Sequence, residues 1–405
     1  MDNLNEKINQ ILNTEPIKSN PTCYIYDLDI IDKQIENIQK YAPSNISLYY
    51  AMKANPNLKI LEHIAKNKFV KGVEIASTGE LEKAENYYNH NQILFTGPGK
   101  TEKELYISVK NKIRLINVES VVEAIRINNI AEELNINKVP ILLRINLNYY
   151  VDEADEFMAG ISTKMGIDQN TFIEEFKHIR ELKHLDIKGL HVFCASGVLD
   201  YKGLVKYADF VFAYVKSLQD KVNFKIDVID FGGGIGIDYT YQNREFDTKS
   251  YFKELKDLIE KYNFENREII MELGKYLVGP CGFYVSRIID IKDIKNYKHI
   301  VLAGGVNHMR LPIATDRKHP LYVIQQNIKP LYETQPRVSN EKVDIEGPLC
   351  MNEDKISWDE FIKSAEIGDL IVVRQSGAYC YSASTLKFLS HYLPEEIILQ
   401  EHFDE

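Results

Sequence analysis

The sequence lacks the features that mark several classes of protein. It has no low-complexity tract and no heptad repeat, and no apolar run approaches the roughly 20 residues that cross a bilayer. The net charge of −10 argues against nucleic acid or an anionic membrane as the main partner. Cysteines are few and form no C-x-x-C pair, which argues against a zinc site, any other metal centre of that kind and a disulfide framework. The five are Cys23, Cys194, Cys281, Cys350 and Cys380.

The first fifteen residues are polar and acidic. They lack the basic end and the apolar stretch of a signal peptide. Together with cysteines that read as free thiols, this predicts a cytoplasmic protein. The length of 405 residues favours two domains over one.

From about residue 45, apolar strands alternate with amphipathic helices. The strands are too apolar for a sheet with one solvent-exposed face. This favours parallel strands that are buried on both faces. Eight strand–helix units predict a TIM (β/α)8 barrel, with a doubly wound open sheet as the alternative. The expected strands are Ser47–Met52, Gly72–Ala76, Ile93–Thr96, Leu115–Val118, Pro140–Asn146, Ile187–Cys194, Ile226–Phe231 and Glu268–Glu272. The expected helices are Leu58–Lys66, Gly79–Tyr88, Lys100–Val109, Val121–Leu134, Thr171–Leu182, Leu204–Leu218 and Ser250–Tyr262.

After Gly274 the sequence pattern changes: strand-like segments follow one another with few helical segments between them. This predicts a β-sandwich or β-barrel domain. An early strand at Thr22–Tyr26 precedes the barrel and is expected to join this domain. The predicted boundaries are 27–275 for the barrel and 1–26 with 276–405 for the β-domain. The later strands are expected at Phe283–Ile291, His299–Ala303, Lys342–Ile345 and Asp369–Gln375.

Three segments place chemistry at the carboxyl ends of the barrel strands. Lys53 follows the first strand, where a partly buried amine can attack an aldehyde, although a lysine snorkelling from a strand end has the same pattern. Gly232, Gly233 and Gly234 follow the seventh strand, where glycines let backbone N–H groups approach a phosphate. Glu272 ends the eighth strand, next to the first in a closed barrel. Together they supply the parts needed to hold pyridoxal phosphate (PLP).

Several motifs resemble the fold-type III PLP enzymes of the ornithine and diaminopimelate decarboxylase family, over about Tyr24 to Leu389. The resemblance implies a homodimer with shared active sites. The matching segments are Tyr50–Asn55, Gly72–Ser77 with Gly79–Leu81, Asp230–Gly236, Glu272–Lys275, Gly347–Cys350 and Gly377–Tyr379.

The resemblance implies a role for each matching residue. Lys53 would bind the cofactor covalently, and Glu272 would bind the pyridine nitrogen. Cys350 would reach into the partner subunit's site and protonate the carbon that loses CO2. The remaining cofactor contacts are expected to be the glycine loop, Ser196, Gly274, Tyr379 and Arg144.

A carboxylate at the position of Glu272 favours decarboxylation, because it keeps the pyridine nitrogen protonated and the ring can then accept an electron pair. A racemase of the same fold would be expected to have an arginine there. A PLP-binding regulator without catalysis is the other alternative, and it is disfavoured because Lys53 and Cys350 are both present.

Three positions depart from the family. Phe193 replaces a histidine that stacks on the cofactor ring; it can still stack but cannot donate a hydrogen bond. Lys275 replaces a phosphate-binding arginine, so a single ammonium group stands where a guanidinium would form two parallel hydrogen bonds. Met351 replaces an acidic residue that pairs with the distal ammonium of a free diamino acid. An unpaired ammonium in a closed site costs several kcal/mol, so free ornithine, lysine or diaminopimelate is disfavoured.

The segment Gly304–Pro312 is followed by the basic residues Arg317, Lys318 and His319. If these residues face the site, the far end of the substrate is anionic. The alternative is that they lie on the surface in contact with water. The segment resembles the decarboxylases of carboxylate siderophore assembly. The expected substrate is therefore citryl-diaminopropionate or citryl-ornithine, with Arg310, His308, Cys350 and Met351 lining its pocket. A free diamino acid and a carrier-protein-bound glutamyl group stay as alternatives; the second shares the G-P-L-C-x-x-E-D pattern of Gly347–Asp354.

Overall fold

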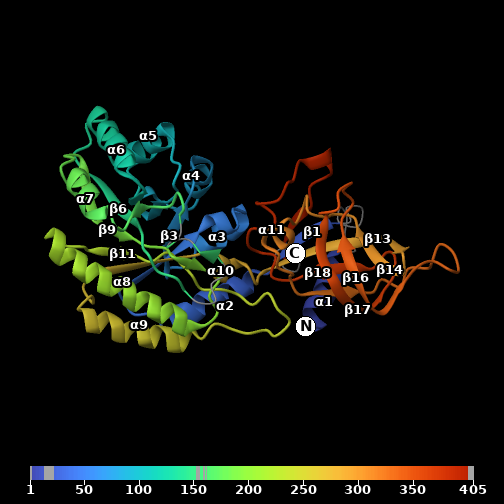
Figure 1. Ribbon diagram of the computed structural model, residues 1–405. Helices are drawn as coiled ribbons and strands as arrows, with labels where there is room; N and C mark the ends of the chain where they lie inside the picture. Colours follow the sequence, from blue (N-terminus) through green and yellow to red (C-terminus); the bar gives the residue numbers. More distant parts are fainter. Residues whose placement is uncertain (1, 13–21, 152–155, 158–159, 161, 400–405) are drawn as a thin grey trace. The chain divides into compact units, whose positions relative to one another are not determined.

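The computed structural model describes residues 2–12, 22–151, 156–157, 160 and 162–399 (Figure 1). They form two compact units. One comprises residues 33–237 and 244–277; the other comprises residues 1–32, 238–243 and 278–405. The sequence predicted a division after residues 26 and 275. The units divide after residues 32 and 277, and the short segment 238–243 belongs to the second unit.

The first unit is a closed barrel of eight parallel strands. Neighbouring strands pair in the order β5-β4-β3-β2-β12-β11-β9-β6, and β6 pairs in turn with β5. This last pairing closes the sheet, so the predicted TIM barrel is confirmed and the open doubly wound sheet is wrong. The strands are β2 (Ile46–Ala51), β3 (Val70–Ile75), β4 (Ile93–Phe95), β5 (Leu115–Val118), β6 (Val139–Asn146), β9 (Leu185–His191), β11 (Val228–Asp230) and β12 (Glu268–Leu273).

Helices follow the strands and lie outside the barrel (Figure 1). Side chains at several helix starts accept backbone N–H groups. Ser77, Thr101 and Ser120 do so, which explains why α4, α5 and α6 begin where they do. The helices are α2 (Leu28–Gln39), α3 (Leu58–Ala65), α4 (Thr78–Ala84), α5 (Glu102–Asn111), α6 (Val121–Glu133), α7 (Phe172–Arg180), α8 (Tyr201–Val222), α9 (Thr248–Tyr262) and α10 (Lys275–Val278). Two single 3-10 turns, η1 (Met52–Ala54) and η2 (His90–Gln92), also occur here.

Most predicted strands differ from the observed ones by one or two residues. Within the barrel, the largest difference is at β9, which ends at His191 and not at Cys194. The chain leaves the barrel there, and Ala195–Ser196 (β10) pairs with Glu156–Phe157 (β7). A further short strand, β8 (Ile167–Asp168), pairs with the end of β6.

The second unit is built on an eight-stranded mixed sheet. The strand order is β15-β18-β13-β14-β16-β17, and β1 pairs with both β13 and β19. The early strand therefore joins the β-rich unit, as predicted. The strands are β1 (Thr22–Tyr26), β13 (Gly282–Ile294), β14 (Tyr297–Leu302), β15 (Leu321–Ile324), β16 (Val338–Glu346), β17 (Lys355–Ala365), β18 (Leu370–Val373) and β19 (Glu395–Ile398). Three short helices accompany them, α1 (Asp2–Leu12), α11 (Leu311–Thr315) and the 3-10 turn η3 (Phe388–Ser390).

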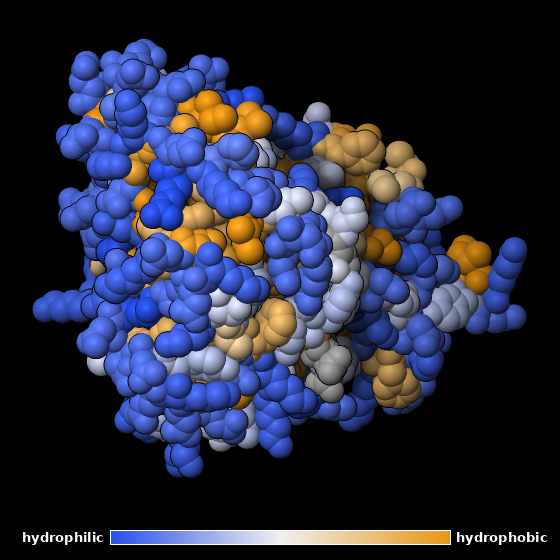
Figure 2. All heavy atoms as spheres, turned by 60° about the vertical axis from the view of Figure 1, so that its left-hand side comes forward, coloured by the Kyte–Doolittle hydropathy of each residue, from blue (hydrophilic) through white to orange (hydrophobic). Residues whose placement is uncertain are grey.

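The visible surface is mainly hydrophilic. In Figure 2, hydrophobic residues occur in small groups separated by polar ones. Among the described residues, none of the helices is both long and apolar enough to span a bilayer.

Candidate active site

Lys53 lies at the carboxyl end of the first barrel strand and pairs with a buried carboxylate. It occupies η1, directly after β2, and its Nζ lies 3.1 and 3.0 Å from the two carboxylate oxygens of Glu74. Glu74 is fully buried in β3, whereas the Lys53 side chain is 38% exposed. The amine is thus held by a buried acid while it stays open to solvent. No role had been assigned to Glu74, although a charge inside an apolar strand was the signal that could have found it.

A cluster of polar side chains surrounds Glu272 at the end of β12. Oxygen or nitrogen atoms of His191, Asp230 and Glu272 all lie within 4.8 Å of one another, and all three residues are buried. Thr96 Oγ1 and Asn117 Nδ2 each lie 3.4 Å from Glu272 Oε1, and Asn117 also donates to Thr96 at 2.8 Å. These five residues come from five different strands or strand ends, so only closure of the barrel brings them together.

Burial dominates the electrostatics of this cluster. It raises the pKa of Glu272 well above its usual value, and the neighbouring charges of Asp230 and Glu74 raise it further, while Lys53 opposes them. Burial also raises the pKa of Asp230 to about 7. The same burial lowers the pKa of His191, so its ring is neutral. Burial therefore favours the protonated form of both carboxyls, and a cation that approaches them favours the charged form.

The predicted phosphate loop lies directly beside Glu272. Gly232 and Gly234 have φ values of +64° and +101°, and the backbone N–H of Glu272 donates to Gly232 O at 2.7 Å. A Cβ atom at Gly233 would lie 2.4 Å from Glu272 O, and one at Gly232 would lie 2.5 Å from the ring of Phe193. Glycine is thus required for this backbone path, and Phe193 packs on the loop.

The other expected cofactor contacts in the barrel lie near the same strand ends. Lys275 is buried at the start of α10, and Ser196 is partly buried in β10. Gly274 packs against the turn that holds Lys53, because a Cβ atom there would lie 2.8 Å from Ala54 Cβ.

Arg144 is engaged elsewhere. Its Nη1 donates to Glu119 Oε1 at 2.7 Å, and both side chains are almost fully buried. Glu119 also accepts the backbone N–H of Gly166 at 2.7 Å. This ion pair occupies Nη1 of the guanidinium, and a contact between Arg144 and the cofactor stays a prediction. A second buried pair, Lys100 with Glu123 at 2.7 Å, lies in the same group of loops.

The remaining predicted site residues belong to the β-rich unit. Cys350 and Arg310 are exposed and Met351 is 40% exposed. Tyr379 is partly buried and has a φ of +61°, a conformation that non-glycine residues rarely adopt and that often marks functional sites. Their position relative to the barrel remains a prediction.

His308 differs from its expected role. It is 2% exposed, its Nε2 lies 2.9 Å from the carbonyl oxygen of Tyr392, and its Nδ1 lies 3.4 Å from the hydroxyl of Tyr284. Burial lowers its pKa to about 4. A neutral ring with both nitrogens engaged stabilises its own unit, so we do not retain His308 as a substrate contact.

The cations that follow Arg310 also pack within their unit. Arg317 lies over the ring of Tyr239, with 5.2 Å from its guanidinium carbon to the ring centre, and Lys318 donates to the carbonyl of Trp358 at 3.0 Å. His319, the third of them, is 2% exposed. Arg310 is the one exposed residue among Arg310, Arg317, Lys318 and His319. Within the part of the chain that the structure describes, it forms no ion pair, whereas Lys318 lies 3.6 Å from Glu360.

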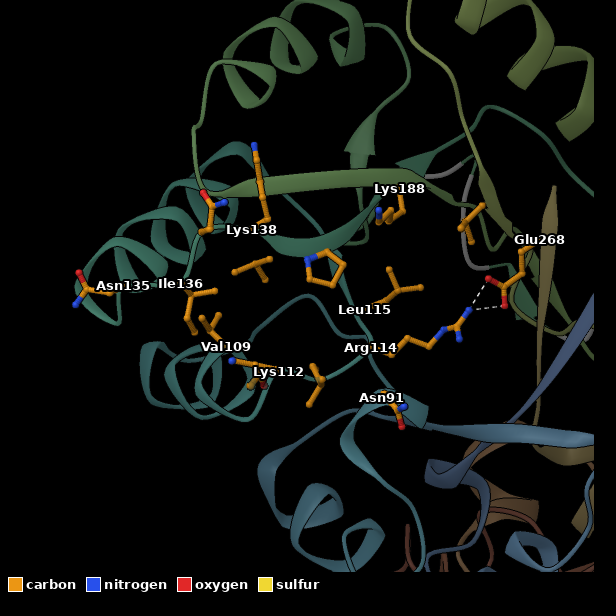
Figure 3. A pocket seen from close by; sticks show the side chains of 16 residues that line it. Asn91, Val109, Lys112, Arg114, Leu115, Asn135, Ile136, Lys138, Lys188 and Glu268 are labelled. Atoms are coloured by element: carbon orange, nitrogen blue, oxygen red, sulfur yellow. Dashed lines mark hydrogen bonds and ion pairs between the residues drawn. The ribbon is translucent and has the colours of Figure 1, made fainter. Parts of the chain in front are cut away.

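The barrel also has a cavity of about 740 Å³ at its opposite end (Figure 3). It is lined by residues that start β5, β6 and β12, and Arg114 spans part of it to pair with Glu268 at 2.6 Å. Lys112 caps the end of α5 here, where a cation complements the helix carbonyls. The amino-terminal end of such a barrel serves stability, so this cavity is separate from the candidate site.

Comparison with known proteins agrees with this geometry. The model of the pyridoxal binding domain of pyridoxal-dependent decarboxylases matches residues 28–279. The 2-[(L-alanin-3-ylcarbamoyl)methyl]-2-hydroxybutanedioate decarboxylase of Staphylococcus aureus is 32% identical, over 95% of this chain and 96% of the relative. The L-glutamyl-[BtrI acyl-carrier protein] decarboxylase of Niallia circulans is 29% identical, over 93% and 88%.

A solved structure extends the likeness to both units. Diaminopimelate decarboxylase from Helicobacter pylori, complexed with L-lysine, superposes with a TM-score of 0.82 at 25% identity, over 97% of this chain and 93% of that one. The residues found here fit the cofactor of this family, because the strand ends supply an amine, a glycine cradle and a buried carboxylate that lacks a cationic partner at hydrogen-bonding distance among the described residues. The chain therefore belongs to the pyridoxal-dependent decarboxylases: it is a PLP-dependent carboxy-lyase.

Proposed function

We propose that this enzyme removes CO2 from an amino acid joined to citrate, either citryl-diaminopropionate or citryl-ornithine, in carboxylate siderophore biosynthesis. The relative from Staphylococcus aureus supports the proposal, since its name describes an alanine unit bound through a carbamoyl group to a hydroxybutanedioate. That substrate has an amino acid at one end and carboxylates at the other.

The observation that carries the proposal is Met351, directly after Cys350. A thioether offers no charge to a distal ammonium, and leaving that ammonium unpaired would cost several kcal/mol. Arg310 is an exposed cation without an ion pair among the described residues, which suits a citryl carboxylate.

Each residue has a proposed task. Bound PLP supplies an electron sink for the pair left by the departing CO2. Lys53 binds the cofactor aldehyde and Glu272 holds the proton at the pyridine nitrogen. Glu74 orients the amine of Lys53 through its two carboxylate oxygens. Cys350 returns a proton to the substrate carbon.

The phosphate end of the cofactor is held by a second group. Backbone N–H groups of the glycine loop, Gly232, Gly233 and Gly234, approach the phosphate. Ser196 and Tyr379 donate to it, and Lys275 supplies a positive charge near it. Phe193 covers one face of the ring by stacking, without donating a hydrogen bond.

We further propose a homodimer in which Cys350, from the β-rich unit, completes the partner subunit's site. The barrel of residues 27–275 then holds the cofactor, and residues 1–26 with 276–405 provide the contacts between subunits. Five free cysteines, four of them buried, support a cytoplasmic location, where thiols stay reduced.

The test is CO2 release by PLP-loaded protein. Citryl-diaminopropionate and citryl-ornithine are compared with free ornithine, lysine and diaminopimelate and with a carrier-bound glutamyl group. We expect turnover of a citryl compound only. Turnover of a free diamino acid would contradict the substrate proposal and show that another acidic residue binds the distal ammonium. The carrier-bound group is the alternative favoured by the 29% identical relative.

A further inference from the structure

We propose that Thr96 and Asn117 are positioning residues that hold Oε1 of Glu272, so that Oε2 is the oxygen that binds the ring nitrogen of the cofactor. Thr96 directly follows β4, and Asn117 lies within β5, two strands that neighbour each other in the barrel. The inference rests on the proposed role of Glu272 at the pyridine nitrogen, but not on the identity of the substrate.

Two donors converge on the same oxygen of Glu272. Thr96 Oγ1 and Asn117 Nδ2 each lie 3.4 Å from Glu272 Oε1. A hydroxyl has one proton to donate, whereas an amide nitrogen has two. Asn117 donates one of its protons to Thr96 Oγ1 at 2.8 Å. The hydroxyl proton of Thr96 and the second amide proton of Asn117 therefore both remain for Glu272.

The other oxygen of Glu272 is not engaged in this way. Within the described part of the chain, no N–H or hydroxyl group donates to Oε2, and the nearest basic nitrogen is His191 Nε2 at 3.9 Å. A carboxylate that is held at one oxygen presents the other in a fixed direction. This asymmetry leaves Oε2 as the acceptor for the ring nitrogen.

The orientation of Asn117 has a cost in stability. Its side chain is fully buried, and its Oδ1 accepts no hydrogen bond from the residues that the structure describes. A buried polar atom without a partner destabilises a fold. The amide thus serves Thr96 and Glu272 with its two protons while its own oxygen stays unsatisfied.

Lys100 fixes the backbones that carry both donors. Its Nζ donates to Gly97 O at 2.8 Å, to Asn117 O at 2.7 Å and to Glu123 Oε1 at 2.7 Å. These bonds use all three protons of the ammonium, and the side chain is 1% exposed. Because Gly97 directly follows Thr96, one buried cation holds the chain at both donors.

The donors also decide which group keeps the proton between Glu272 and the ring nitrogen. Hydrogen bonds to a carboxylate favour its charged form, so the two donors lower the proton affinity of Glu272. The proton then stays at the ring nitrogen, where it strengthens the electron sink. Loss of one donor should shift the proton towards Glu272 and weaken the sink.

The test compares Thr96→Val, which has the shape of threonine without its hydroxyl, with Thr96→Ser, which keeps the hydroxyl. PLP enriched in the heavy nitrogen isotope at its ring is bound to each variant, because the NMR shift of that nitrogen reports its protonation without turnover. We expect a smaller protonated fraction in Thr96→Val than in the wild type, and recovery in Thr96→Ser. Equal protonated fractions in the wild type and Thr96→Val would overturn the proposal.

The second measurement is CO2 release from whichever substrate the wild type decarboxylates. Thr96→Val should lower kcat by about tenfold and change KM much less, because the lost bond acts on the electron sink. Thr248→Val is the control, since Thr248 lies in α9 and is 7% exposed, close to the 5% of Thr96. Equal losses in the two variants would make Thr96 merely structural.

A double-mutant cycle separates the inference from the proposed function. Glu272→Gln should lower the protonated fraction by itself, and adding Thr96→Val should then lower it no further. A further loss of the same size as in the single variant would show that Thr96 acts on another group. If Glu272→Gln lowers the fraction and Thr96→Val does not, the inference alone fails. An unchanged fraction in Glu272→Gln would refute the proposed role of Glu272, and the inference with it.

Discussion

Burial disfavours the charged form of Asp230, and this effect can be measured as a change of stability with pH. It ends β11, is fully buried, and uses Oδ1 to accept the backbone N–H of Gly232 at 2.8 Å. The charged and titratable groups that face it are Glu272 and Glu74, with Lys53 and the neutral His191 close by. We expect Asp230→Asn to keep the hydrogen bond from Gly232, since the amide oxygen is also an acceptor, and to remove the titration.

The magnitude follows from the pKa. Burial raises it from 3.8 in the unfolded chain to about 7 in the folded protein, which corresponds to roughly 4 kcal/mol. The folded state binds this proton more tightly, so its stabilising contribution is complete below pH 4. It is lost as pH rises to about 7 and is constant above that pH. Between pH 5 and 7 the loss is about 2 kcal/mol.

The assay is urea unfolding of the cofactor-free protein from pH 5 to pH 8. Between pH 5 and 7, the wild type should lose about 2 kcal/mol more of its free energy of unfolding than Asp230→Asn loses. Asp209→Asn is the control, because hydrogen bonds from Lys261 and Tyr262 lower the pKa of Asp209, so it does not titrate in this range. If the wild type and Asp230→Asn had parallel pH profiles, burial would not raise the pKa of Asp230 as argued.

Three further predictions concern the substrate, the subunits and the barrel wall. Arg310→Ala should raise KM for a citryl substrate by tenfold or more, as loss of one charge-assisted hydrogen bond implies; an unchanged KM would remove Arg310 from the substrate site, and Arg317→Ala is the control, because that side chain packs on Tyr239. Mixing Lys53→Ala with Cys350→Ala should restore CO2 release, because a heterodimer with shared sites has one intact site; no recovery after confirmed subunit exchange would place Cys350 in its own subunit's site. Lys100→Met should lower the free energy of unfolding, measured with urea, by about 3–5 kcal/mol, because it leaves Glu123 buried without its partner. Lys177→Met is the control: it removes an exposed ion pair with Glu174 and should lower the free energy of unfolding by less than about 1 kcal/mol.

The barrel could be predicted from the sequence because its strands are buried on both faces. Such strands read as continuous apolar runs, and β2, β5 and β12 were located almost to the residue. The same runs ended at Lys53 and Glu272, so counting strands was enough to bring these two residues to one end of the barrel. The strand β17 was missed because its residues alternate between buried and exposed, which leaves no apolar run.

The tertiary structure alone decided which polar groups meet. Glu74, His191, Asp230 and Asn117 lie on strands far apart in sequence, and only closure of the barrel places them around Lys53 and Glu272. Likewise, Asp354 joins two loops about 40 residues apart through backbone N–H groups, which no side-chain pattern reveals. The sequence by itself thus determined where each strand ends and what chemistry stands there, because burial acts on every residue of a strand in turn. The pKa values and the pairing of the buried charges depend on distances across the barrel, and those exist only after folding.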